Sequence, residues 1–254
     1  MKKFKAMCAF VLASMCLLAF SGCDDNESSG KATETTEHIE ITEAQNNEDF
    51  NIKDLHSFDL ENGDEFSGAW QITAGAGSKL GNFVYMFDGK GSANLIVGTT
   101  GYCSEYSLDE NAKTFTCQLM FGINDSYTYK KSSDDEIVLT NSNSKETTTL
   151  SRLASYDMIP IPDQDAVIDD KLIGVWKSDS GEFYYFDNSG IMYQNQYGTM
   201  YTFYKYTAKD GIITAVSNMG EDEDQTDTLK YSVSDDILTI DGYNYTKTST
   251  DELI

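Results

Sequence analysis

The feature that most constrains this chain is an internal repeat with a period of about 100 residues. Three short motifs occur in the same order in both copies: Gly-Ala-Trp at 68–70 and Gly-Val-Trp at 174–176, Phe-Asp-Gly-Lys-Gly at 87–91 and Phe-Asp-Asn-Ser-Gly at 186–190, Ser-Asp-Asp at 133–135 and again at 234–236. Motifs that recur in one order at a nearly constant offset predict two tandem domains with the same fold.

Both copies have the pattern of β-strands throughout. Short segments rich in Tyr, Phe, Ile, Val and Thr alternate with turns made of Gly, Asp, Asn and Ser. The strands expected in the second copy are Leu172–Lys177, Glu182–Asp187, Ile191–Tyr197, Met200–Thr207, Ile212–Ser217, Thr228–Val233, Ile237–Asp241 and Tyr243–Thr248. The first copy divides in the same way. The pattern predicts an all-β protein with two tandem antiparallel up-and-down barrels of about eight strands each.

Changes in composition set the expected domain boundaries. We expect a first β domain at 66–153, a second at 171–248 and a short tail at 249–254. The linker between the domains, 154–170, contains the only two prolines of the chain. Because proline fixes φ and lacks an N–H, this stretch favours a semi-extended connection.

The segment ahead of the first copy, 23–65, is strongly acidic. Between residues 24 and 64 it carries 13 acidic residues against Lys31 and Lys53. A chain with so few apolar residues cannot bury enough surface to offset the entropy of ordering, so we expect a disordered tether. Its isolated apolar residues can still dock locally on a folded domain. They are Ile39, Ile41, Phe50, Ile52, Leu55 and Phe58.

The first 23 residues resemble the signal of a bacterial lipoprotein. Three lysines precede an apolar run at 6–20, and Ser21-Gly22 then precedes Cys23. The run is shorter than a membrane span and is typical of a signal-peptide core. The resemblance implies that the signal peptide is 1–22 and that lipid is attached to Cys23. The protein would then be anchored at the extracytoplasmic face of a bacterial membrane.

The net charge limits the partners. It is −24, and removal of the three lysines of the signal makes it −27. Such a chain is repelled by phosphate backbones, so we expect no nucleic-acid partner. The acidic run at 221–227 is the best candidate for Ca²⁺, because clustered carboxylates suit that ion, but it lacks the glycine and final glutamate of an EF-hand loop. A solvated hairpin loop is the expectation, with no metal and no cofactor.

Two cysteines, Cys103 and Cys117, remain once the signal and the lipidated Cys23 are set aside. They are centred on residue 110, in the middle of an expected turn at 109–113, so a hairpin would place them opposite each other. An even pair of cysteines in an exported chain is a disulfide candidate. We therefore predict a disulfide between Cys103 and Cys117. The alternative is two buried free thiols.

Catalysis is tested by asking which reactive groups the domains contain. The only histidines, His38 and His56, lie in the expected tether. With both domain cysteines bonded, neither domain has a histidine base, a thiolate nucleophile or the usual zinc ligands. A hydrolase based on a carboxylate pair remains, with Glu105 and Glu182 as candidates. Acids on the outer face of a strand are the ordinary solvated pattern, so we expect no catalytic residues.

The Gly-x-Trp opening, the Phe-Asp-x-x-Gly hairpin and the short aromatic strands resemble lipocalin-like domains of exported bacterial lipoproteins. The resemblance implies that Trp70 and Trp176 lie on the first strand of each barrel and close one end of it. A barrel of eight strands is wide enough for side chains or one small ligand. We expect a non-enzymatic, lipid-anchored protein that binds a small molecule, a glycan or a protein partner. The alternatives are an envelope-associated structural protein without a discrete ligand, and a carboxylate-dependent hydrolase.

The second copy is the better candidate for binding because it is rich in aromatic residues. Alternation sends Tyr184 and Phe186 to one face of their strand, and Phe183 and Tyr185 to the other. If one face is core, the other presents an aromatic surface of the kind used against sugars, peptides or proteins. The alternative is cross-strand packing that only stiffens the sheet. The sequence does not identify the ligand-binding residues.

Overall fold

The computed structural model describes residues 50, 52, 55, 63–75, 83–119, 123–218, 220 and 224–253. The chain divides into two compact units, 1–42 and 43–254, and the described residues belong to the second. The predicted signal peptide, Cys23 and both histidines lie outside the described residues. The interpretations of these segments therefore stay predictions.

The described chain is all-β, as predicted. Its strands are β1 (Gly68–Gly75), β2 (Phe83–Phe87), β3 (Ser92–Val97), β4 (Thr100–Asp109), β5 (Thr114–Leu119), β6 (Ile123–Ser133), β7 (Glu136–Asn141), β8 (Thr147–Leu153), β9 (Gly174–Lys177), β10 (Phe183–Phe186), β11 (Ile191–Gln196), β12 (Met200–Lys209), β13 (Ile212–Ser217), β14 (Gln225–Ser234), β15 (Ile237–Ile240) and β16 (Tyr243–Thr248). Short 3₁₀ helices occur at Asp170–Leu172 (η2) and Thr250–Leu253 (η3).

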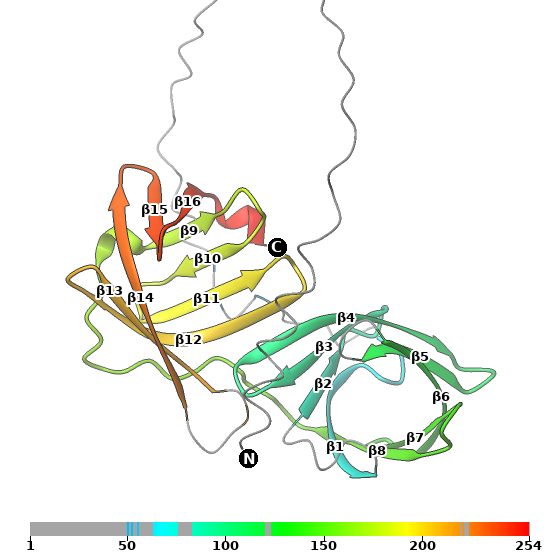
Figure 1. The fold of residues 1–254 in the computed structure, drawn as a ribbon. Coiled ribbons are helices and arrows are strands. Elements are labelled where there is room, and N and C mark those ends of the chain that lie inside the picture. The colour runs from blue at the N-terminus through cyan, green and yellow to red at the C-terminus, as the bar shows by residue number, and fades with distance from the viewer. Residues whose placement is uncertain are drawn as a thin grey trace, which may run out of the picture. The chain divides into compact units, whose positions relative to one another are not determined.

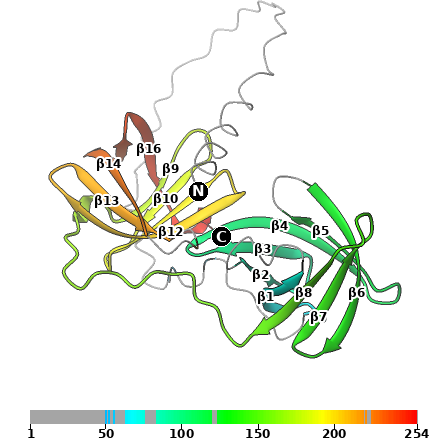
Figure 2. The ribbon, with the colours of Figure 1, turned by 60° about the horizontal axis from the view of Figure 1, so that its bottom comes forward.

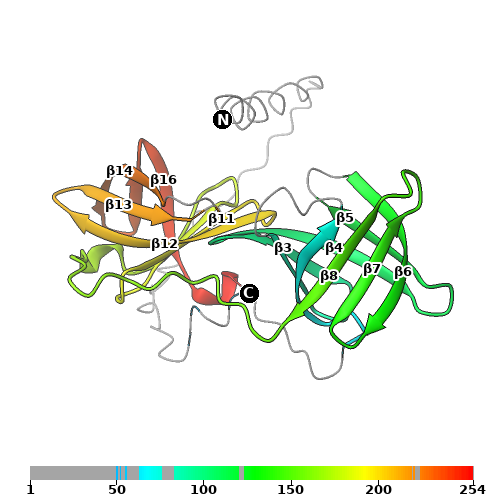
Figure 3. The same ribbon diagram turned by 90° about the horizontal axis from the view of Figure 1, so that it is seen from below.

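Strands β1–β8 form a closed antiparallel barrel, which we call the first repeat (Figure 1). Each strand pairs with the next in chain order, and β8 returns to pair with β1. Figure 3 shows β6, β7 and β8 side by side on one wall. Closure leaves no edge strand within this barrel, as the meander pattern predicts.

The eight further strands, β9–β16, follow the same order of pairing and are called the second repeat (Figure 2). Neighbours in the chain pair with each other, and β16 pairs with β9. The hairpin motifs of the two copies are built alike. Asp88 Oδ1 accepts from the N–H groups of Lys90 and Ser92, and Asp187 Oδ1 accepts from those of Ser189 and Ile191. The sequence repeat is therefore also a repeat of local geometry.

A short ladder joins the starts of β4 and β12. Gly101 pairs with Tyr201 at its centre, and a Cβ at position 101 would lie only 2.2 Å from Tyr201 Cζ. On the two sides of this pair, Cys103 N–H donates to the carbonyl of Thr199 and Phe203 N–H donates to that of Thr99, both at 2.9 Å. Residues 100 positions apart, Cys103 and Phe203 as donors and Thr99 and Thr199 as acceptors, thus form equivalent hydrogen bonds, as in a two-fold interface. Glycine is needed at position 101, because the two strands approach most closely there.

Both tryptophans are fully buried on the first strand of their repeats. Trp70 Nε1 donates to the carbonyl of Phe66 at 2.5 Å, and Trp176 Nε1 donates to that of Leu172 at 2.7 Å. Each bond ties the indole to the chain four residues earlier. The chain entering each repeat is thereby fixed against the interior, and the buried indole N–H is satisfied.

A cation from the last strand of each repeat covers its tryptophan. The Arg152 guanidinium lies 4.1 Å from the Trp70 ring centroid, and Lys247 Nζ lies 5.4 Å from that of Trp176. Arg152 Nη1 also donates to the carbonyl of Ser67. Because Arg152 is on β8 and Trp70 is on β1, the contact reinforces the strand pair that closes the first barrel.

The aromatic residues of the second repeat alternate as predicted. Tyr184 and Phe186 lie in its core, whereas Tyr185 packs on the opposite face. That face is covered by the chain itself and is not an open aromatic surface. The residues that meet there are Phe50, Ile52, Leu55, Met158, Ile159, Tyr185, Ile191, Tyr193, Tyr201, Phe203 and Leu253. Phe50 meets Tyr185 edge-on at 5.2 Å, so local docking of apolar residues from 23–65 is confirmed for this residue.

Replacing Arg152 by Met keeps most of the apolar stem but removes the charge over Trp70 and the bond to Ser67. We expect the free energy of unfolding to fall by about 1–3 kcal/mol. Lys247→Met is the matched variant, and its longer contact predicts a smaller loss of about 0.5–1 kcal/mol. Urea unfolding monitored by tryptophan fluorescence measures both. Equal losses in the two variants would contradict the closing role of Arg152.

Candidate functional site

The predicted disulfide is wrong, because Cys103 and Cys117 are free thiols. The β4–β5 ladder pairs Asp109 with Thr114, and therefore Tyr106 with Cys117. The turn is thus centred between residues 111 and 112, and not on residue 110 as predicted. Cys117 lies on the same face of the sheet as Tyr106, and Cys103, three residues before Tyr106, lies on the opposite face. Cys117 belongs to the buried core of the first barrel, whereas Cys103 is exposed. The alternative of free thiols holds, but only Cys117 is buried.

Both thiols are expected to react with N-ethylmaleimide without prior reduction, and Cys103 is expected to react first. Burial raises the pKa of the Cys117 thiol to about 11, so little thiolate is present at neutral pH. Peptide mass spectrometry of Cys23→Ala protein labelled over time at pH 7.5 measures the two rates. Labelling that requires a reductant, or faster labelling of Cys117, would contradict this arrangement.

The other candidate groups are not brought together. Glu105 has an exposed side chain on β4 of the first repeat, whereas Glu182 precedes β10 of the second. Of the acidic run, 221–223 lies outside the described residues, and Asp224 Oδ1 accepts from Asn218 Nδ2 at 3.1 Å. Within the described ranges, no group of three or more His, Cys, Asp or Glu is placed to hold a metal ion. Those ranges also include no helix with the length and apolar character needed to cross a membrane.

A polar cluster packs against the core of the second repeat, with Glu182, Gln194 and Tyr204 half-buried. We call it the Glu182 cluster, and its members are Glu182, Tyr184, Gln194, Tyr204 and Tyr245. Gln194 Nε2 donates to Glu182 Oε1 and to the Tyr184 hydroxyl, both at 2.8 Å. The Tyr245 hydroxyl donates to Glu182 Oε2 at 2.8 Å, and that of Tyr204 donates to Gln194 Oε1 at 3.2 Å. Residues from β10, β11, β12 and β16 thus converge with Glu182 on one carboxylate–amide pair.

Burial sets the electrostatics of the Glu182 cluster. Desolvation is the largest cause that raises the pKa of its three tyrosines, and the charge of Glu182 adds to it. The pKa of Tyr204 rises to about 12, and those of Tyr184 and Tyr245 also lie well above their usual value. All three phenols are therefore neutral at physiological pH and keep their O–H donors. The cluster combines hydrogen-bond donors with a half-buried carboxylate acceptor beside a largely aromatic core.

The first barrel has different chemistry at the equivalent positions. In β2–β3, Tyr85 pairs with Leu95, and in β10–β11, Tyr184 pairs with Gln194. Two residues before these tyrosines stand Phe83 and Glu182. The polar groups that surround Tyr184 are thus replaced by apolar ones around Tyr85.

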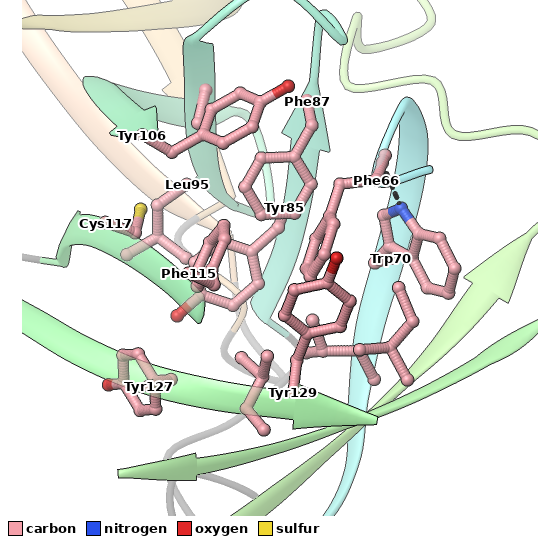
Figure 4. Packing of buried hydrophobic residues seen from close by; sticks show 14 residues of the cluster. Phe66, Trp70, Tyr85, Phe87, Leu95, Tyr106, Phe115, Cys117, Tyr127 and Tyr129 are labelled. Atoms are coloured by element: carbon pink, nitrogen blue, oxygen red, sulfur yellow. Dashed lines mark hydrogen bonds between the residues drawn. The ribbon is translucent and has the colours of Figure 1, made fainter. Parts of the chain in front are cut away.

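The interior of the first barrel is built from stacked aromatic rings (Figure 4). Phe66 stacks on Phe115 with centroids 4.7 Å apart and rings nearly parallel at 4°. Figure 4 shows Cys117 and Tyr127 across the interior from Trp70. Most phenol groups in this interior have carboxylate acceptors. The Tyr106 hydroxyl donates to Asp64 at 2.7 Å, that of Tyr127 donates to Asp125 at 3.3 Å and that of Tyr129 donates to Glu65.

No protein-family model matches this chain, and no curated protein matches it. The candidate function therefore rests on the residues of the two interiors. Sequence reasoning considered Glu182 only as one half of a catalytic pair and missed its neighbours. The available signal was alternation, because Glu182 and Tyr184 share a strand face and Gln194 lies opposite Tyr184 in the next strand.

Proposed function

We propose that the protein is a non-enzymatic, lipid-anchored binding protein of a bacterial envelope, built from two lipocalin-like barrels. The second repeat would bind a small molecule rich in hydroxyl or amide groups, such as a glycan fragment. The observation that carries this proposal is the Glu182 cluster, in which half-buried polar side chains from separate parts of the sheet converge beside an aromatic core.

The cluster is better suited to binding than to filling a core. Even partial burial of polar groups costs free energy, and the positions equivalent to Glu182 and Gln194 in the first barrel are filled by Phe83 and Leu95 without that cost. Small-molecule sites typically combine apolar walls with a few convergent polar groups. A carboxylate offers about four acceptor positions, and Gln194 and Tyr245 use two at Glu182. Acceptor capacity thus remains for hydroxyl or amide groups of a ligand.

Glu182→Gln is the variant that tests the cluster. It keeps the shape of the side chain but replaces one carboxylate oxygen by a donor, so we expect a retained ligand to be lost or bound at least tenfold more weakly. The measurement is native mass spectrometry of Cys23→Ala protein exposed to an extract of envelope small molecules.

Glu105→Gln is the matched control, because it removes one negative charge from the outer face of β4. We expect it to retain the same ligand mass as the parent protein. A parent protein that captures no small molecule, or equal retention by both variants, would contradict binding at Glu182.

Cys23→Ala tests the anchor. If lipid on Cys23 holds the protein, the variant freed of residues 1–22 moves from the membrane fraction to the soluble extracytoplasmic fraction, because no apolar chain remains to insert. Fractionation followed by immunoblotting measures the shift, with Cys103→Ala as the control that should stay with the membrane. Continued membrane retention of Cys23→Ala would contradict lipid anchoring.

A further inference from the structure

We infer that the ligand of the second repeat is an uncharged oligosaccharide, whose sugar rings stack on the exposed side chains of Tyr197 and Tyr243 outside the core. The inference rests on the proposed function, because it extends the ligand of the Glu182 cluster beyond the cluster itself. We call Tyr197 and Tyr243 the tyrosine rim. The two residues are 63% and 72% exposed, so their rings are available for contact.

Strand pairing places the tyrosine rim at the end of the repeat that holds Glu182. Glu182 lies just before β10 and Tyr197 just after β11, and these strands are antiparallel, so both residues lie at one end. Tyr243 begins β16 and shares a strand face with Tyr245, whose hydroxyl donates to Glu182 at 2.8 Å. Tyr197 also lies near enough to Tyr245 to contribute to its raised pKa. Figure 1 shows β16, β9, β10 and β11 as successive neighbours in the sheet.

The turns beside the tyrosine rim are open. A Cβ added at Gly181, Gly198 or Gly242 would meet no other atom of the described chain within 4 Å. The matched turn of the first repeat differs, because a Cβ at Gly98 would lie 2.2 Å from the carbonyl oxygen of Asn218. A polymer can therefore reach the tyrosine rim past these turns, whereas the chain itself occupies the space beside Gly98.

The backbone conformation of Tyr197 is unusual for a bulky residue. Its φ is +56°, in the left-handed region that favours glycine and asparagine. The other non-glycine residues with positive φ in the described chain are lysines and aspartates. Strained positions of this kind cluster at ligand sites, where contact with the ligand compensates for the strain. Because the ring of Tyr197 is mostly exposed, packing within the protein offers little such compensation.

The first repeat lacks the whole set of rim and acidic residues. Thr148 faces Leu139 in β7–β8 as Tyr243 faces Ile240 in β15–β16, so Thr148 is the match of Tyr243. The residues that correspond to Glu182, Tyr197 and Tyr243 are Phe83, Val97 and Thr148. The carboxylate and both exposed tyrosines thus occur together in one repeat and are replaced together in the other, as expected of groups that serve one ligand.

The chemistry of this end selects an uncharged sugar. The apolar C–H face of a pyranose ring packs on a tyrosine ring, and its hydroxyls can donate to the remaining acceptor positions of Glu182. Asp224 and Asp227 are exposed at the start of β14, and the charge of Asp227 helps to raise the pKa of Tyr204 in the Glu182 cluster. An anionic glycan would be repelled by these carboxylates and by the net charge of −24.

Isothermal titration of Cys23→Ala protein with defined trisaccharides tests the tyrosine rim. The probes are cellotriose, maltotriose and N-acetylchitotriose, which are uncharged, and trigalacturonic acid, which is anionic. We expect at least one uncharged trisaccharide to bind one-to-one and more tightly than its own monosaccharide, and trigalacturonic acid not to bind. Tyr197→Asn and Tyr243→Thr should each weaken trisaccharide binding about five- to tenfold, because each removes one stacked ring.

Ile161→Asn is the matched control, because it removes an exposed apolar side chain from the linker and should leave the affinity unchanged. Tyr197→Asn should be at least as stable to urea as the parent, since asparagine tolerates positive φ, so its weaker binding would not reflect unfolding. The inference is overturned if no uncharged trisaccharide binds, if trigalacturonic acid binds equally well, or if both rim variants keep the parent affinity.

The outcomes for the tyrosine rim and for the Glu182 cluster are distinguishable. If Glu182→Gln loses the ligand captured from envelope extract while both rim variants retain it, the proposed function stands and the rim inference fails. If trisaccharide binding depends on the tyrosine rim but is unchanged in Glu182→Gln, stacking on the rim stands and the proposed role of Glu182 fails.

Discussion

The pairing of the first strand with the last is the constraint on which each repeat depends. In the first repeat, β1 pairs with β8, and Arg152 of β8 lies over Trp70 of β1. The indole N–H is bonded to the chain just before β1, so one residue links the entry, the first strand and the last strand. Once the first and last strands are paired, the inward side chains of all eight strands share one interior. Those side chains then decide what the interior of the repeat can bind.

The two repeats show how one strand plan holds two different interiors. A pair of equivalent tyrosines, Tyr85 and Tyr184, faces a leucine in one repeat and a glutamine in the other. The exchange of Phe83 for Glu182 adds a carboxylate at the next inward position. The order of the strands stays the same in both repeats, although Phe83 begins β2 whereas Glu182 stands just before β10. The same strand order can therefore carry an apolar interior in one repeat and polar groups in the other.

Much of the fold was predictable because it depends on local patterns. Period-two alternation and turn residues located the strands of both copies, and the repeat of Gly-x-Trp marked the start of each. The disulfide was not predictable in this way, because a small change in the centre of one turn moves a cysteine to the other face. The covering of Tyr185 by Phe50 was also beyond local patterns, because it joins residues far apart in the chain.

The candidate sites were less predictable than the strands. Glu182 was visible as an acid near a strand, but its bonds to Gln194 and Tyr245 depend on the pairing of β10 with β11 and on the place of β16. A binding site depends on the positions of a few polar groups, whereas the fold depends on the summed pattern of many apolar residues. The fold is therefore easier to predict from sequence.

The most direct test of binding is a high-resolution crystal structure of the protein purified under native conditions from its own membrane. The account predicts non-protein electron density inside the second repeat, within hydrogen-bonding distance of Glu182. An interior in which protein side chains and water account for all density around Glu182 would contradict it.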